Sequence, residues 1–70
     1  MKKRLVIFGG GDMAQLAAFY FANDSEYEVV AFTVDRAYAN GGEAFGRPLV
    51  PFDDVERLFA PSEHDLFVAL

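Results

Sequence analysis

The chain alternates between short apolar runs and polar or glycine-rich segments. Residues 4–8 carry an apolar run that ends in glycines. Residues 28–34 carry a second, rich in β-branched and aromatic residues, and residues 65–70 carry a third. Runs with so few polar interruptions are typical of strands buried on both faces, as in parallel sheets. The pattern therefore predicts three strands.

A helix is predicted between the first two strands. Residues 13–22 are rich in alanine and contain neither glycine nor proline, which favours helix. At about 100° per residue, one face collects most of the bulky side chains, and we expect it to lie on the sheet: Met13, Leu16, Ala17, Tyr20 and Phe21. We expect a neighbour to pack on the smoother opposite side, which carries Ala14, Gln15, Ala18, Phe19 and Ala22.

The second half of the chain is less regular. Residues 35–46 are polar, with Asn40-Gly41-Gly42 at their centre, and are predicted to form a loop. Residues 47–51 are predicted to be extended, because each of their two prolines keeps the preceding residue out of the helical region.

A second, short helix is predicted before the last strand. Asp53 or Asp54 can cap it, it runs to Phe59, and Pro61 stops it. Strands separated by helical segments indicate parallel pairing with right-handed crossovers. The predicted fold class is therefore α/β, a Rossmann-like βαβαβ unit with a small parallel sheet, formed by residues 1–70 as one domain.

The turn after the first strand reads Gly9-Gly10-Gly11-Asp12-Met13-Ala14. It fits the G-x-G-x-x-G/A fingerprint of phosphate-binding turns, which lies between a strand and a helix. In that fingerprint the first glycine permits a tight exit, the second lets a phosphate approach the backbone, and the last small residue keeps the helix near the sheet. A helix N-terminus also attracts anions. The alternative is a glycine-rich turn that only connects.

Two acidic residues bear on this site. Asp35 ends the second strand, where a carboxylate can accept hydrogen bonds from ribose hydroxyls or a base N–H; alternatively it only starts a turn. Asp12 is expected to cap the helix, although its charge would repel a phosphate, and in the other interpretation it contacts a hydroxyl or amine of the ligand. Arg36 is interpreted as a solvated surface residue rather than a phosphate contact.

Composition limits the class of protein. The 70 residues are 53% hydrophobic, with eight phenylalanines and three tyrosines, and contain no cysteine. A chain this short does not easily hide so much apolar material, so we expect self-association, or contact with a further part of a longer chain. Disulfides and thiolate metal sites are excluded.

Charge and hydrophobicity indicate which partners and which cellular compartment to expect. The net charge of −5 argues against binding nucleic acid. The apolar stretch after the basic cluster at residues 2–4 is too short for a secretory signal, and nothing approaches a transmembrane length. We therefore expect a cytoplasmic protein without a membrane partner.

No catalytic or metal-binding residue is predicted. His64 is the only histidine, and no nucleophile that a carboxylate orients is apparent near it. It is interpreted as a surface residue, and Glu63 and Asp65 as solvated turn residues. No ligand spacing typical of a metal site occurs.

Four segments follow one another at the intervals of a known family. They are Arg4 to Gly11, Glu28 to Phe32, Gly46-x-Pro48-Leu49-Val50, and Asp65 to Ala69. Their order resembles the N-terminal domain of bacterial sugar O-acyltransferases, which include sialic acid O-acetyltransferases and acetyltransferases of nucleotide-linked amino sugars. The resemblance spans nearly all of the chain.

The resemblance implies a Rossmann-like domain that binds a UDP-type nucleotide-sugar. In the family a left-handed β-helix domain follows, forms a homotrimer, binds acetyl-coenzyme A and carries the catalytic histidine. That domain has no counterpart in these residues, so His64 does not take the histidine's role. What carries over is the turn from Gly9 to Met13, facing sugar and phosphates, and Asp35 as the nucleotide contact. Asp12, where the family has a small residue, and Val34-Asp35, where it often has paired acids, are departures.

Two other classes stay open. The fingerprint alone also fits the first half of an NAD(P)-dependent oxidoreductase or sugar epimerase. The third class is a regulatory or interaction module that has lost its ligand, which the negative charge of Asp12 in a phosphate-binding turn would support. Because the last strand stops without a following turn, we expect the chain to be the N-terminal part of a longer protein.

Overall fold

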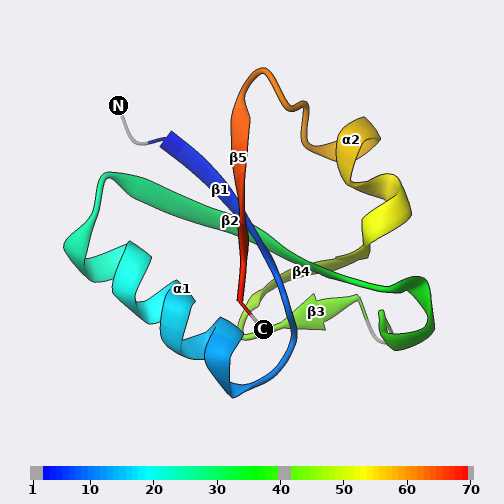
Figure 1. The fold of residues 1–70 in the computed structure, drawn as a ribbon, viewed down its shortest axis with the longest axis horizontal. Helices are drawn as coiled ribbons and strands as arrows, with labels where there is room; N and C mark the ends of the chain where they lie inside the picture. Colours follow the sequence, from blue (N-terminus) through cyan, green and yellow to red (C-terminus); the bar gives the residue numbers. More distant parts are fainter. Residues whose placement is uncertain (1–2, 40–41, 70) are drawn as a thin grey trace.

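The computed structural model of the chain describes residues 3–39 and 42–69. The larger elements are β1 (Lys3–Phe8), α1 (Asp12–Asp24), β2 (Tyr27–Val34), β3 (Glu43–Ala44), β4 (Arg47–Pro51), α2 (Val55–Leu58) and β5 (His64–Val68) (Figure 1). Two short 3-10 turns, η1 (Arg36–Tyr38) and η2 (Phe52–Asp54), precede β3 and α2. The predicted α/β fold is confirmed.

The strands of the described residues form one sheet in the order β3-β4-β2-β1-β5. β1 pairs in parallel with β2 and β5, and β2 pairs in parallel with β4. The parallel strands are thus arranged third, second, first, fourth, which is the order of the first four strands in a dinucleotide-binding sheet. β3 is antiparallel to β4 and was not predicted.

The predicted element boundaries are close to the observed ones. β1, β2 and β5 each begin one residue earlier than expected, and residues 47–51 form a strand. The short helix spans Val55–Leu58, with Asp54 at its N-cap but no side-chain capping hydrogen bond. The expectations for Asn40-Gly41 and Leu70 lie outside the described residues.

The helices α1 and α2 lie on opposite faces of the sheet (Figure 1). Successive side chains of β1 point to opposite faces of the sheet. Leu5 and Ile7 belong to the core cluster under α1, and Val6 lines a cavity with residues of α2. This alternation follows from the two-residue period of a strand. No helix in the described part of the chain is long and apolar enough to cross a membrane.

The predicted orientation of α1 is wrong. Ala14 and Ala18 are the buried residues of the helix, whereas Met13, Leu16 and Tyr20 are 56%, 63% and 55% exposed. Small side chains let the helix approach the sheet closely: the Ala14 Cβ lies 3.4 Å from where a Cβ on Gly9 would be. The docked face lies between the two predicted sides: Ala14 and Ala18 come from the side interpreted as free for a neighbour, whose other members Gln15, Phe19 and Ala22 are exposed. Of the predicted inner face, Ala17 and Phe21 do pack against the core.

Candidate functional site

Gly9 makes the tight exit from β1 that the fingerprint requires. Its φ is +140°, a region that side-chain-bearing residues rarely adopt. Its N–H donates to the carbonyl oxygen of Thr33 at 2.9 Å, and a Cβ on it would lie 2.6 Å from the carbonyl oxygen of Ala69. The backbone of Ala69 therefore requires glycine at this position.

The next two glycines have more room. A Cβ on Gly10 would lie 3.4 Å from Cγ1 of Val34, and a Cβ on Gly11 would meet no atom within 4 Å. Gly11 has extended backbone angles and is exposed. The space beside Gly11 is thus open to solvent, where the fingerprint expects a phosphate.

The expectation that Asp12 caps α1 is wrong. Gly11 occupies the N-cap position, Asp12 is the first residue of the helix, and no side chain makes a capping hydrogen bond there. The N–H groups of a first helical turn have no partners within the helix, and here no cap replaces them. Asp12 is exposed, and its negative charge interacts favourably with the positive end of the helix dipole.

A pocket of about 580 Å³ opens at the carboxyl ends of β1 and β2. It is lined by Gly9 and Gly10 and also by Asp35, which is distant from them in the sequence. Its other lining residues are Phe8, Val34, Tyr38, Glu43, Ala44, Phe45 and Leu49. Gly11 and Asp12 lie outside this lining, and Met13 lines a different groove, between α1 and β5.

Asp35 is the N-cap residue of η1 and contacts this turn through its main chain, not through its side chain. Its carbonyl oxygen accepts the Tyr38 N–H at 2.8 Å, and its carboxylate makes no capping hydrogen bond. Both the turn and the site interpretation are therefore compatible with its position, because the carboxylate is exposed while the residue lines the pocket.

The pocket is acidic and aromatic. Asp35 and Glu43 are its charged lining residues, and none of its described lining residues is Lys, Arg or His. Arg36 is paired elsewhere: its Nε lies 3.2 Å from Asp53 Oδ2, and its Nη2 lies 3.3 Å from Asp54 Oδ1. An anion at this end of the sheet would therefore be held by main-chain N–H groups.

Tyr38, Glu43 and Phe45 were missed by the sequence interpretation, which treated residues 35–46 as a plain loop. Phe45 and Gly46 have φ of +53° and +79° and form the two-residue turn between β3 and β4. The ring of Phe45 packs edge-on against Phe32, with centroids 5.2 Å apart. Gly46 was the available signal for a turn between two short extended segments, whereas a bulky residue such as Phe45 seldom adopts a positive φ. Nothing in the sequence marks Tyr38.

The first residues of β5 make side-chain contacts that were not expected. His64 begins the strand, with its Nδ1 3.0 Å from the Ala60 carbonyl oxygen. Asp65 is not a free turn residue: its Oδ2 accepts a hydrogen bond from the Tyr27 hydroxyl at 2.7 Å, which raises the pKa of Tyr27. In the described part of the chain, no group of three or more acidic or histidine side chains is placed to hold a metal ion.

Comparison of the chain with known protein families, curated proteins and solved structures finds no match. A functional assignment therefore depends on the chain's own residues, above all on the pocket shared by Gly9, Gly10 and Asp35.

Proposed function

We propose that the chain binds a UDP-type nucleotide-sugar at the carboxyl ends of β1 and β2, as the substrate-recognition domain of a cytoplasmic sugar acyltransferase. The observation that carries the proposal is the shared pocket of Gly9, Gly10 and Asp35. Its volume of about 580 Å³ is within the ordinary range for small-molecule sites, about 300–1,000 Å³.

The chemistry of the lining assigns parts of the ligand to parts of the site. The phosphates lie against Gly11 and the first turn of α1, where main-chain N–H groups have no side-chain cap and the helix dipole favours an anion. The carboxylate of Asp35 accepts hydrogen bonds from ribose hydroxyls. The aromatic rings of Tyr38 and Phe45, which line the same pocket, offer apolar contact to the base.

The acyl-transfer part of the proposal comes from the family resemblance. In that scheme acetyl-coenzyme A is held by a β-helix domain of the full-length, trimeric protein, and the residues described here select the sugar-bearing substrate. The 70-residue chain alone then has no acetyltransferase activity, because the family's catalytic histidine belongs to the other domain.

A second candidate is an NAD-binding half-domain. The order of the parallel strands, β4-β2-β1-β5, is that of a dinucleotide-binding sheet, and an acid at the end of the second strand is its usual ribose contact. The acidic lining makes NAD a better ligand than NADP, whose 2′-phosphate would meet the charge of Asp35.

Calorimetric titration separates the two candidates. We expect the chain to bind a UDP-sugar and UDP, and NADH weakly or not at all. The variant Asp35→Asn replaces one acceptor oxygen of the carboxylate with an NH₂ donor, so one ribose hydroxyl loses its acceptor and UDP-sugar binding should weaken by about 1–3 kcal/mol. The matched control Asp24→Asn, at the far end of α1, should leave the affinity unchanged.

A second variant tests the phosphate position. Gly11 is extended and has open space beside it, so Gly11→Val should fold, yet its side chain would occupy the place of the phosphate and abolish binding. Tight NADH binding without a UDP-sugar response would favour the second candidate, and no binding of either ligand would overturn both.

A further inference from the structure

One edge of the sheet carries apolar side chains that the described part of the chain leaves in solvent. β5 pairs with β1, and no strand of the described residues pairs with its other side. Leu66, Phe67 and Val68 are 46%, 40% and 54% exposed. Successive side chains of a strand point to opposite faces, so β5 is apolar on both faces, as strands in the interior of a parallel sheet are.

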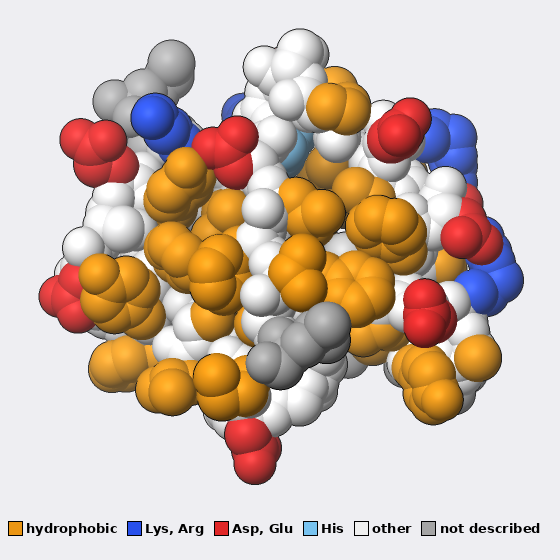
Figure 2. Space-filling view, viewed as in Figure 1, with side chains coloured by type: hydrophobic (Ala, Val, Ile, Leu, Met, Phe, Trp, Pro, Cys, Tyr) orange, Lys and Arg blue, Asp and Glu red, His pale blue; other side chains and the backbone are white. Residues whose placement is uncertain are grey.

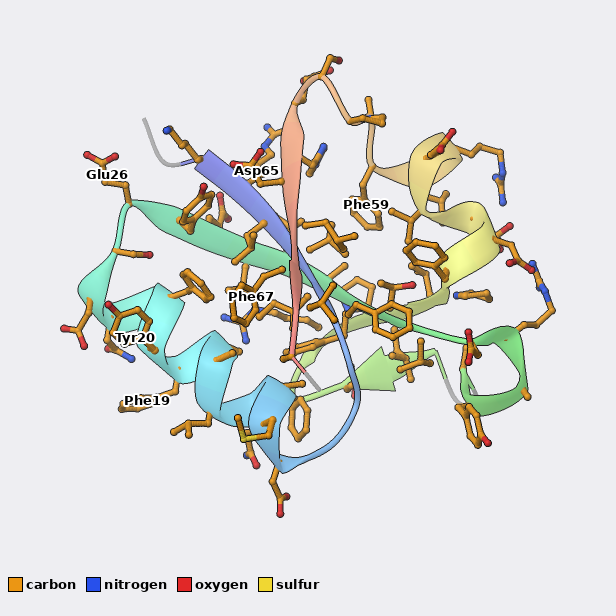
Figure 3. The ribbon with its side chains drawn as sticks, in the orientation of Figure 1. Phe19, Tyr20, Glu26, Phe59, Asp65 and Phe67 are labelled. Atoms are coloured by element: carbon orange, nitrogen blue, oxygen red, sulfur yellow. The ribbon has the colours of Figure 1, made fainter. Side chains whose placement is uncertain are left out.

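A groove of about 540 Å³ lies between β5 and α1. It is lined almost entirely by apolar residues: Met13, Leu16, Ala17, Tyr20, Phe21, Phe67, Val68 and Ala69. Figure 2 shows apolar side chains gathered on both sides of the β5 backbone, with carboxylates toward the periphery. In Figure 3 Phe67 lies between β5 and α1, and Tyr20 projects from α1. The edge and the groove form one continuous surface, called here the β5 surface.

The two edges of the sheet differ in protection. The edge formed by β3 has only two residues, Glu43 and Ala44, and short charged edges resist pairing. β5 has five residues, His64–Val68, with no lysine, proline or bulge. Its carboxylate, Asp65, is held by the Tyr27 hydroxyl. The β5 edge thus offers main-chain donors and acceptors without the usual protection against another strand.

We propose that the β5 surface pairs with the same surface of a second copy of the chain, with the two β5 strands antiparallel. A two-fold interface brings one patch against itself, so each β5 strand supplies the partner that the other lacks. Because the two-fold axis is perpendicular to the sheet, both α1 helices fall on the same face and the two grooves merge around the Phe67 rings.

The available area and charge fit a second copy. Half of an aromatic side chain is about 100 Å², so Met13, Leu16, Tyr20 and the three exposed residues of β5 give at most roughly 600 Å² per copy. Complete burial of these side chains in two copies gives up to about 1,200 Å², which reaches the lower bound for a stable specific interface. The centre of the surface is uncharged, so two chains of net charge −5 meet without opposing carboxylates.

Sedimentation of the purified chain tests the proposal. We expect a dimer at tens of micromolar, and we expect Leu66→Lys to raise the dissociation constant about tenfold or more. Leu58→Lys is the matched control, because Leu58 on α2 is 47% exposed against 46% for Leu66; it should leave the dimer intact. Tyr20→Lys, on the helix side of the groove, should weaken the dimer in the same direction without altering β5. Circular dichroism establishes that each variant is folded.

The absence of cysteine from the chain provides a direct test of geometry. Leu66→Cys should form a disulfide-linked dimer on mild oxidation, since antiparallel pairing brings the two β5 strands together, and Leu58→Cys should not. A monomer at tens of micromolar, or a dimer that Leu58→Lys disrupts and Leu66→Lys and Tyr20→Lys spare, would overturn the proposal. A monomer would also leave a different strand, from another protein or another part of a longer chain, as the occupant of this edge.

Discussion

The carbonyl oxygen of Ala69 occupies the space that a side chain on Gly9 would need, only 2.6 Å from an added Cβ. The clashing atom belongs to the backbone, and the φ of Gly9 is +140°, so neither partner can move at low cost. We expect Gly9→Ala to lower the free energy of unfolding by about 3 kcal/mol or more, from strain and steric overlap together.

Chemical denaturation measures this effect. Gly11→Ala is the control, because its Cβ meets no atom within 4 Å, and it should cost less than about 1 kcal/mol. Equal losses for the two variants would show that the turn is not pinned by Ala69.

The packing of α1 predicts opposite outcomes for two alanines. Ala18 is buried against the sheet, so Ala18→Leu should overpack the interface and cost about 1–3 kcal/mol of stability. Ala22 is exposed, and Ala22→Leu should change stability by less than about 0.5 kcal/mol. Thermal unfolding of both variants measures the difference. If Ala18→Leu left stability unchanged, the face with Met13, Leu16 and Tyr20 would have to be the one that docks.

Thr33 has a buried hydroxyl without a hydrogen-bond partner in the described structure. Burying such a group costs free energy that no hydrogen bond returns. Thr33→Val keeps the shape and removes the hydroxyl, and we expect it to raise the free energy of unfolding by about 1 kcal/mol.

Thr33→Ser provides the comparison, because it keeps the hydroxyl and removes the methyl group. It should destabilise the chain by about 1 kcal/mol. If Thr33→Val were the less stable of the two in urea denaturation, the hydroxyl would have to be paired.

The Tyr27–Asp65 hydrogen bond gives stability a dependence on alkaline pH. The bond to the Asp65 carboxylate raises the pKa of Tyr27 above its ordinary value of 10.0. The unfolded chain releases this proton first, so the contribution is fully present below pH 10.0 and is lost as the pH rises through the folded pKa.

Tyrosinate absorbance during an alkaline titration checks the shift. Asp65→Asn should lower the pKa of Tyr27 toward 10.0, and Tyr27→Phe should remove its share of the alkaline loss of stability. If the pKa of Tyr27 were the same in Asp65→Asn, the Asp65 carboxylate would not be the cause of the raised pKa.

β1 and β2 could be predicted from the sequence because burial leaves nearly uninterrupted apolar runs. β5 was predicted from the same apolar pattern, although its Leu66, Phe67 and Val68 are exposed. The meeting of Gly9 with Asp35 was also predictable, since the carboxyl ends of neighbouring parallel strands share an edge. The orientation of α1 was not. Both predicted sides of that helix are apolar, and close approach to the turn at Gly9, rather than hydrophobicity, places Ala14 and Ala18 at the centre of the docked face.

The remaining wall of the pocket could not be predicted for a different reason. β3 has only two residues, Glu43 and Ala44, too few for a period to appear. The pocket contribution of Tyr38 depends on how η1 folds back toward β4, which is a tertiary arrangement without a local sequence pattern.

The central position of β1 has a consequence for the order in which the molecule can assemble. Residues 4–8 pair on one side with residues 64–68, so β1 cannot be paired on both sides until a segment about 60 residues further along the chain is present. Closing so long a loop costs entropy before its contacts form. During synthesis the end of β1 therefore lacks its hydrogen bond from the Ala69 N–H to the Phe8 carbonyl oxygen until β5 has left the ribosome.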